Sequence, residues 1–312
     1  MNILITGGCG YTGTVLTNDL VRLGHNITVV DTQWFGNHLT SKKNLKIIKL
    51  DIRDHKKIPL KEIDCVVHLA NIANDPGVEL NPTLSWEVNV LATQKLIENS
   101  IKSKVEHFIF ASSGSVYGLK KEKKVTEELS LLPISTYNKT KMVAERVLKS
   151  YENDIKLHCI RPATVCGYSP RMRLDVSVNM FAFQALKKKS MSVFGGEQIR
   201  PNIHIKDLIN VYKHFIFNPN IKSGFYNAGF ENLKILTIAK EVAKIIPSKI
   251  IIKKNNDKRS YRQNSDKLLL TGFKKLFSVS DAIHEIKKMY ELKKFRETKK
   301  CYTVKWMKAL RL

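Results

Sequence analysis

Short apolar runs alternate with longer amphipathic segments through the first half of the chain. The runs have the length of buried strands, and the longer segments repeat apolar residues at helical spacing. Strands that alternate with helices form βαβ units, so we expect an α/β fold with a doubly wound parallel sheet covered on both faces. The predicted strands are residues 3–5, 27–31, 45–48, 65–69, 107–111 and 157–160, and the predicted helices are residues 13–23, 84–101 and 136–151.

The alternation weakens after residue 162, where loops become longer. We expect one helix at about 176–189 and a hairpin-like piece around 193–196, which together begin a smaller C-terminal α/β lobe. Residues 285–312 are rich in Lys and Arg, a composition typical of a solvated, partly disordered helix. The predicted units are residues 1–165, a second lobe at 166–290 that is partly interleaved with the first, and a basic tail at 291–312.

Composition narrows the class of protein. The chain has 312 residues, of which 43% are hydrophobic and 26% charged, so a sizeable core is expected and disorder is not. There is no apolar run of about 18 residues and no basic start followed by an apolar stretch, so we expect neither a membrane span nor a signal peptide. The 5 cysteines contain no C-x-x-C pair, which favours a reducing, cytoplasmic setting and argues against a zinc site.

The net charge is strongly positive. Lys and Arg number 53 against 28 Asp and Glu, a formal charge of +25. Such a charge suits a polyanionic partner such as nucleic acid, an anionic membrane or a phosphorylated substrate. The charge is spread along the chain, however, and there is no recognisable nucleic-acid motif or row of aromatic residues between the basic ones. We therefore favour a generally Lys-rich proteome as its origin and expect no nucleic-acid partner.

A glycine-rich loop lies between the first strand and the first helix. Gly7, Gly10 and Gly13 have the spacing G-x-x-G-x-x-G, with Tyr11 and Thr12 before the third glycine. Glycine at these positions permits a tight turn and lets the backbone approach a diphosphate, while the helix N-terminus offers free N–H groups. The loop therefore predicts a dinucleotide site in a Rossmann-type domain over residues 1–165.

An acidic residue ends the second predicted strand. A carboxylate at Asp31 accepts hydrogen bonds from the adenosine ribose hydroxyls and repels the 2′-phosphate of NADP. Thr32 and Gln33 supply no compensating cation. The predicted cofactor is therefore NAD.

A tyrosine and a lysine share one face of the helix at 136–151. Tyr137 and Lys141 are four residues apart, and a nearby ammonium group together with an oxidised nicotinamide ring favours the phenolate. Ser113 follows the strand at 107–111, at the edge of the sheet where ligands bind in open α/β folds. This combination predicts proton transfer by Tyr137.

These residues occur within a longer series of motifs that resembles the extended short-chain dehydrogenases/reductases acting on nucleotide sugars. The nearest comparison is the NAD-dependent epimerase/dehydratase group, which includes the 4-epimerases of UDP-glucose, and the resemblance covers roughly residues 1–280. The matching segments are residues 6–13, 50–54, 68–71, 89–93, 111–118, 137–141, 161–165, 194–207 and 257–262.

The resemblance implies a role for each matched residue. Tyr137 would take the proton of a sugar hydroxyl, Ser113 would bind the same oxygen, and Lys141 would hold the nicotinamide ribose and tune Tyr137. Hydride transfer to NAD would then give a 4-keto sugar, and an epimerase would return the hydride to the other face. The implied cofactor-binding set is Gly7, Gly10, Tyr11, Thr12, Gly13, Asp31, Asp51, Ile52, Leu69, Ala70, Asn89, Tyr137 and Lys141.

The substrate side of the resemblance is less regular. The 4,6-dehydratases of the group have an Asp–Glu pair where this chain has Gly114 and Ser115, so dehydration is disfavoured. Thr164 stands where 4-epimerases often have Asn, and residues 166–175 resemble a branch that includes a heptose 4-dehydrogenase. Arginines are suited to the substrate diphosphate because their planar fork binds phosphate, and Phe194 could stack on the base. The implied substrate-binding set is Ser113, Thr164, Arg171, Arg173, Asn179, Phe194, Arg200 and Arg259.

The sequence therefore predicts an NAD-dependent nucleotide-sugar epimerase that oxidises a sugar hydroxyl transiently. An NAD-dependent nucleotide-sugar dehydrogenase or reductase is the alternative, with a 4,6-dehydratase, a non-catalytic NAD-binding regulator and a nucleic-acid binder further behind. The helices at 84–101 and 136–150 pair two-fold in the group, which implies a homodimer. We expect His68 and His204 to be structural and expect no resident metal.

Overall fold

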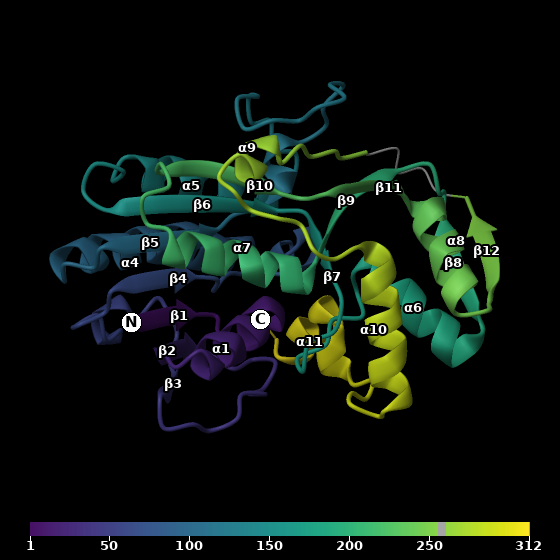
Figure 1. The fold of residues 1–312 in the computed structure, drawn as a ribbon, viewed down its shortest axis with the longest axis horizontal. Coiled ribbons are helices and arrows are strands. Elements are labelled where there is room, and N and C mark those ends of the chain that lie inside the picture. Colours follow the sequence, from purple (N-terminus) through teal and green to yellow (C-terminus); the bar gives the residue numbers. More distant parts are fainter. Residues whose placement is uncertain (255–259, 312) are drawn as a thin grey trace.

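The structure is a computed structural model that describes residues 1–254 and 260–311. Within these residues a seven-stranded parallel sheet has the strand order β10-β6-β5-β4-β1-β2-β3 (Figure 1). This is the doubly wound α/β arrangement that the sequence predicts. The strands are β1 (Asn2–Thr6), β2 (Asn26–Asp31), β3 (Leu45–Lys49), β4 (Cys65–His68), β5 (His107–Ala111), β6 (Lys156–Pro162) and β10 (Gly224–Ala228).

The six predicted strands are all present, and β10 was missed. Its sequence, Gly-Phe-Tyr-Asn-Ala, mixes polar and apolar residues and lies in a region assigned to the second lobe. It joins the edge of the sheet beside β6. There the Asn227 side chain accepts a hydrogen bond from the Tyr117 hydroxyl and donates to the backbone carbonyls of residues 125 and 264. Tertiary contacts rather than an apolar run therefore make this segment a strand.

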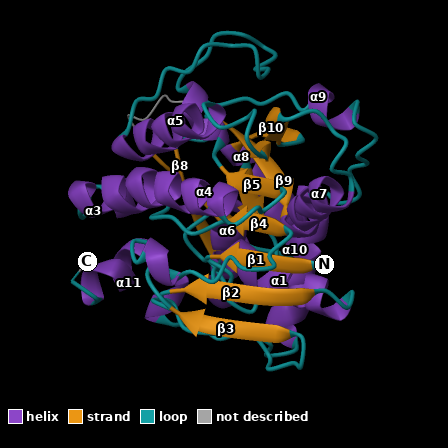
Figure 2. Ribbon diagram, turned by 90° about the vertical axis from the view of Figure 1, so that its left-hand side faces the viewer, coloured by secondary structure: helices purple, strands orange, loops and turns teal. Residues whose placement is uncertain are grey.

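Helices cover both faces of the sheet, as Figure 2 shows. On one face α1 (Tyr11–Arg22) and α7 (Ile205–Phe217) pack together, and on the other α4 (Ala92–Lys102) packs against α5 (Thr136–Lys149). Each pair buries its apolar side chains against the strands, Leu16 and Phe215 on the first face and Leu96 and Leu148 on the second. The two hydrophobic layers fix the strands whose carboxyl ends carry the site.

The helix predicted at 84–101 is interrupted. It begins as α3 (Pro82–Trp86), passes through a π-helical turn at Glu87–Leu91 and continues as α4. The turn contains Asn89, whose side chain accepts from the backbone N–H of Ile72 at 2.8 Å and donates to its carbonyl at 3.1 Å. The interruption therefore tethers the loop that follows β4.

A second lobe is built from the segments after β6. It contains a three-stranded sheet of β11 (Glu231–Lys234), β9 (Ile199–His204) and β7 (Thr164–Cys166) and a pair of β8 (Ser190–Phe194) with β12 (Lys249–Lys253). The predicted hairpin around 193–196 is wrong, because β8 runs parallel to β12. The lobe's helices are α6 (Ser177–Lys188), α8 (Ile235–Ile245) and α10 (Val279–Glu291), with the short α2 (Asp75–Val78) and α9 (Asp266–Leu269) elsewhere.

The basic C-terminal segment is folded. After α10 the chain forms a 3-10 turn at Lys299–Cys301 and the helix α11 (Thr303–Ala309), and Phe295, Cys301 and Met307 are buried. The segment is partly helical and mostly exposed, as expected, but the expected disorder is wrong, because apolar residues between the lysines pack against the body of the protein. The division of the chain into units at residues 1–165, 166–290 and 291–312 stays a prediction.

The helices of the described residues are all too short or too polar to cross a membrane.

Candidate functional site

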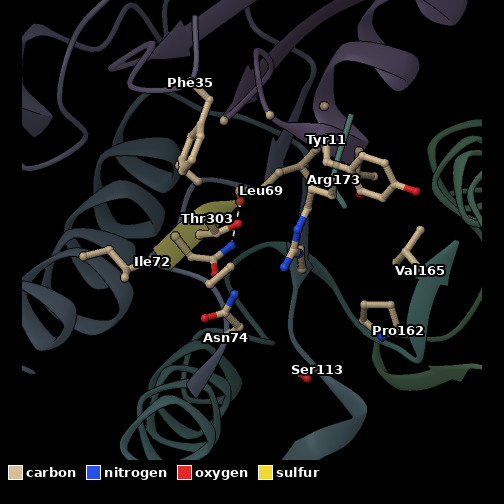
Figure 3. Close-up of a pocket in the computed structure, with 18 of the residues that line it drawn as sticks. Tyr11, Phe35, Leu69, Ile72, Asn74, Ser113, Pro162, Val165, Arg173 and Thr303 are labelled. Carbon is tan, nitrogen blue, oxygen red and sulfur yellow. Dashed lines mark hydrogen bonds between the residues drawn. The ribbon is translucent and has the colours of Figure 1, made fainter. Parts of the chain in front are cut away.

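A cavity of about 490 Å³ lies at the carboxyl edge of the parallel sheet, between the sheet and the second lobe. That volume is within the roughly 300–1,000 Å³ typical of small-molecule sites. Its walls include the loops that follow β1, β2, β3, β4 and β5, together with α5, β7 and β9. Figure 3 shows the side chains of Tyr11, Phe35, Arg173 and Ser113 around it.

The glycine loop forms one wall of the cavity. A Cβ atom on Gly13 would lie 2.2 Å from the Gly7 carbonyl oxygen, and one on Gly7 would lie 2.6 Å from the backbone nitrogen of Ala70. Gly7 also has a φ of +73°, in the region that favours glycine. The N-terminus of α1 has no side-chain cap, so backbone N–H groups of this 12-residue helix remain for a ligand. Gly10, Tyr11 and Thr12 line the cavity beside them.

The carboxylate of Asp31 is held at the end of β2. Its Oδ2 accepts from the Cys9 backbone N–H at 2.9 Å and its Oδ1 from the Gln33 N–H at 2.6 Å. Burial raises the pKa of Asp31, and these two hydrogen bonds oppose that shift. Each oxygen keeps an acceptor site that a ligand hydroxyl can use.

The other predicted cofactor residues divide into lining and supporting groups. Asp51, Ile52, Leu69 and Ala70 line the cavity, and Arg53 holds the Asp51 carboxylate at 2.9 Å. Asn89 does not line it, because its amide is engaged with the loop at residue 72 and with a buried threonine hydroxyl. The structure gives Asn89 a supporting position one layer behind the wall.

Ser113, in the loop after β5, and Tyr137, on α5, face the same cavity. Burial raises the pKa of Tyr137 to about 12, while a hydrogen bond with the Ser113 hydroxyl and the charge of Arg173 act to lower it and Asp75 acts to raise it. Without a ligand the phenol is therefore protonated at neutral pH. The pair can bind one oxygen of a ligand in common.

Lys141 has a different environment from the one predicted. Its Nζ donates to the Ala111 carbonyl at 2.7 Å, lies 4.7 Å from the centre of the Phe110 ring and does not line the cavity. Burial lowers the pKa of Lys141 to about 7. The cation that acts on Tyr137 in this structure is Arg173, whose side chain extends into the cavity toward the Ser113 end (Figure 3).

Ser115 supports Ser113. The two hydroxyls are 2.8 Å apart, and the Ser115 hydroxyl donates to Oδ1 of Asn138 at 2.6 Å. Asn138 follows Tyr137 on α5, so this short chain of hydrogen bonds links Ser113 to the helix that carries the tyrosine. Gly114, which lies between the serines, has no functional group.

The predicted substrate residues are only partly brought together. Thr164, Arg171, Arg173 and Arg200 line the cavity. Asn179 is fully buried outside it, where its amide binds the Gly167 backbone and the Tyr11 hydroxyl. Phe194 is outside it as well and 53% exposed. Arg259 lies outside the described residues.

Sequence reasoning missed several lining residues. Trp34 and Phe35 follow Asp31, Tyr212 comes from α7, and Thr303 and Met307 come from α11. The aromatic pair after Asp31 was a usable signal, since it interrupts a polar loop beside the cofactor strand. Nothing in the local sequence indicated that α11 reaches the site.

His68 and His204 have structural positions, as predicted. His68 is buried and bonded through both ring nitrogens, to Thr6 at 2.6 Å and to Thr93 at 2.8 Å, and burial lowers its pKa to about 3. His204 is buried at the start of α7, where its Nδ1 accepts from the Lys206 N–H at 3.0 Å. Among the residues that the structure describes, no group of three or more His, Cys, Asp and Glu could hold a metal ion.

The chain resembles known proteins in sequence. The NAD dependent epimerase/dehydratase family matches residues 3–229. The UDP-glucose 4-epimerase of Lactobacillus helveticus is 27% identical over 276 residues, which cover 78% of this chain and 82% of that protein. UDP-glucuronic acid decarboxylase 1 of Xenopus tropicalis is 28% identical over 260 residues, 79% of this chain and 60% of that longer protein.

The fold has close counterparts among solved structures. The UDP-glucose 4-epimerase of Thermotoga maritima, solved with UDP-glucose, superposes with a TM-score of 0.83 at 23% identity and covers 94% of this chain and 99% of that one. The glycine loop, the free helix N-terminus and Asp31 fit NAD, as predicted. The match over residues 3–229 shows that the chain belongs to the NAD dependent epimerase/dehydratase family.

Proposed function

We propose that the protein is a nucleotide-sugar 4-epimerase that uses NAD. The observation that carries the proposal is the shared cavity: the hydroxyls of Ser113 and Tyr137 face the same space as the glycine loop and Asp31. The likeness to UDP-glucose 4-epimerases in sequence and in fold supports the same activity.

In this mechanism Tyr137 removes the proton from the sugar hydroxyl, and Ser113 binds the same oxygen. NAD held by the glycine loop and Asp31 would supply the acceptor and later the donor of the hydride and, while oxidised, a positive charge that favours the phenolate. That charge is needed because the pKa of Tyr137 is about 12 in the chain alone and Lys141 is bound to a carbonyl. Arg173 contributes in the same direction.

Tyr137 also returns the proton to the sugar oxygen. After oxidation the protonated phenol and Ser113 hold the carbonyl oxygen of the keto sugar, and the phenol gives its proton back when the alcohol re-forms. The Ser115 hydroxyl, 2.8 Å from that of Ser113, keeps it oriented and is itself held by Oδ1 of Asn138 at 2.6 Å. Since Gly114 and Ser115 carry no carboxylate, this segment does not supply the acid and base of a dehydration.

Substrate recognition is proposed for the end of the cavity away from Asp31. Arg173 and Arg200 supply cations for the diphosphate of the nucleotide sugar, and Thr164 supplies a hydroxyl for the sugar. Tyr261 lines this end too, with the Arg200 guanidinium 5.2 Å from its ring centre.

The test is a turnover screen with no added cofactor. The purified protein is incubated with UDP-, GDP-, CDP- and dTDP-sugars, and products are separated and read by mass and proton NMR. An isomer of unchanged mass, formed without release of NADH, supports the epimerase.

The alternatives give different products. A product lighter by two hydrogens, with one NADH formed for each and turnover only on adding NAD, identifies a dehydrogenase. Loss of water identifies a dehydratase, and loss of carbon dioxide from a UDP-glucuronic acid identifies a decarboxylase. Each of these results overturns the proposed epimerase.

A further inference from the structure

The cavity contains a buried cation that the mechanism above does not use. Arg171 is only 5% exposed and lines the cavity, yet its Nε and Nη1 atoms have no hydrogen-bond partner. A buried guanidinium without an acceptor is costly, so an anionic ligand that supplies one is expected there. Burial and the neighbouring charge of Arg173 lower the pKa of Arg171 to about 10, which leaves it charged at neutral pH.

Arg171 is anchored to the glycine loop rather than to the sugar end. The Tyr11 hydroxyl donates to the Gly167 carbonyl at 2.7 Å, and the Ser169 hydroxyl donates to the Tyr11 carbonyl at 2.8 Å. These bonds dock the segment that carries Arg171 onto the first turn of α1. The Arg171 guanidinium and the free backbone N–H groups of α1 are therefore two independent sets of hydrogen-bond donors that face one cavity.

The remaining neighbours of Arg171 belong to the loop after β2. The guanidinium lies 4.0 Å from the centre of the Phe35 ring, and its charge acts on the Asp31 carboxylate. By contrast, the cation that acts on Tyr137, one of the two hydroxyls proposed to bind the sugar, is Arg173. Arg171 is therefore on the dinucleotide side of the cavity.

The C-terminal segment closes this side from outside. Thr303 donates its backbone N–H to Asp175 at 2.8 Å, and the Trp306 indole donates to the Trp34 carbonyl at 2.5 Å. Met307 is buried among the residues near α2, and α11 contacts α2. Figure 2 shows α11 beside the carboxyl ends of β2 and β3, so the helix bridges the loops that follow β2 and β4.

We propose that Arg171 binds the diphosphate of NAD from the second-lobe side and that α11 covers the bound dinucleotide. The diphosphate is the anionic group of the cofactor and the one that the N-terminus of α1 also addresses. The cover retains the cofactor on the protein between half-reactions, as an epimerase requires. The inference rests on the NAD site and goes beyond the sugar chemistry.

The test compares the binding of two diphosphates. Arg171→Met, Arg171→Lys and the control Arg22→Met, whose arginine side chain is 77% exposed, are stripped of nucleotide and titrated with NAD and separately with UDP by calorimetry. Thermal unfolding of each apoprotein checks the fold. We expect Arg171→Met to bind NAD about 10- to 100-fold more weakly, the range for a lost hydrogen bond to a charged group. UDP binding should change less than about twofold, and the control should leave both unchanged.

A second arm addresses the cover. The substitution Trp306→Phe removes the hydrogen bond to residue 34 and keeps an aromatic ring. In a chase of labelled, prebound NAD with unlabelled NAD, this variant should release the cofactor at least about fivefold faster.

Three results overturn the inference. Weakened UDP binding with unchanged NAD binding would assign Arg171 to the substrate diphosphate. Unchanged binding of both NAD and UDP would mean that Arg171 has a structural role. If Arg171→Met does not fold, the same measurements on Arg171→Lys answer the question. An unchanged rate of NAD release from Trp306→Phe would show that α11 does not retain the cofactor. These readouts need no turnover, so failure of the epimerase proposal would leave them interpretable.

Discussion

Replacing Glu145 by leucine should destabilise the protein by about 3–5 kcal/mol, the cost of leaving one member of a buried ion pair unpaired. Glu145 on α5 binds the Arg161 guanidinium at 2.7 and 2.9 Å and accepts from the Ser112 hydroxyl, and the two charged side chains are 1% and 3% exposed. Arg161 also donates to the Tyr117 hydroxyl at 2.7 Å. The network joins α5 to β5 and β6 directly behind Ser113.

The expected shift in Tm follows from the size of the chain. Unfolding entropy is about 2.1 cal/mol/K per residue near 60 °C, or about 0.65 kcal/mol/K for a chain of this length. A loss of about 3–5 kcal/mol therefore lowers Tm by about 5–8 °C. Circular dichroism during heating measures the shift, and urea unfolding at 25 °C measures the free energy.

Two further variants separate pairing from packing. Glu145→Leu/Arg161→Met removes both charges and should recover most of the loss, because the cost lies in the orphaned guanidinium. Glu152→Gln breaks the exposed pair with Lys149 and should change the free energy of unfolding by less than about 1 kcal/mol. If the double variant were no more stable than Glu145→Leu, the reasoning from the unpaired charge would be refuted.

The remaining predictions concern the site, pH and assembly. Tyr137→Phe should fold and hold NAD but lose about a hundredfold or more in turnover; near-normal turnover would contradict the mechanism. Gly13→Ala should purify without NAD because its Cβ would meet the Gly7 carbonyl at 2.2 Å, whereas Gly24→Ala, with no atom within 4 Å, should keep the cofactor. His68 has a folded pKa of about 3, below its usual value, so the unfolded chain binds the extra proton and stability falls as pH drops from about 6.5 toward 3. His68→Gln should flatten that slope in urea unfolding by at most about 1.4 kcal/mol per pH unit, and an unchanged slope would exclude His68 as its source. Light scattering should give a dimer mass, since α4 and α5 pack side by side as in the dimer interface that the family resemblance implies; a monomer mass would contradict it.

The sequence alone was sufficient for six of the seven strands of the parallel sheet, for the glycine loop and for NAD. These features are local: a strand, a glycine turn and a helix follow one another, and the spacing from Gly7 to Gly13 and the carboxylate at Asp31 can be read directly. The family motifs that carry them also placed Ser113 and Tyr137, which the structure brings to one cavity.

Tertiary structure decided how distant segments share that cavity. Tyr137 and Lys141 are correctly placed on one helix, but the lysine amine turns to the Ala111 carbonyl and Arg173 becomes the cation near the phenol. The C-terminal segment looked like a solvated tail because its lysines dominate the composition, whereas its few apolar side chains, such as Met307, find their partners on α2 and the loop after β2. Periodicity and spacing describe neighbours along the chain. Which charge lies beside which hydroxyl depends on packing between segments far apart in sequence, and only the fold determines it.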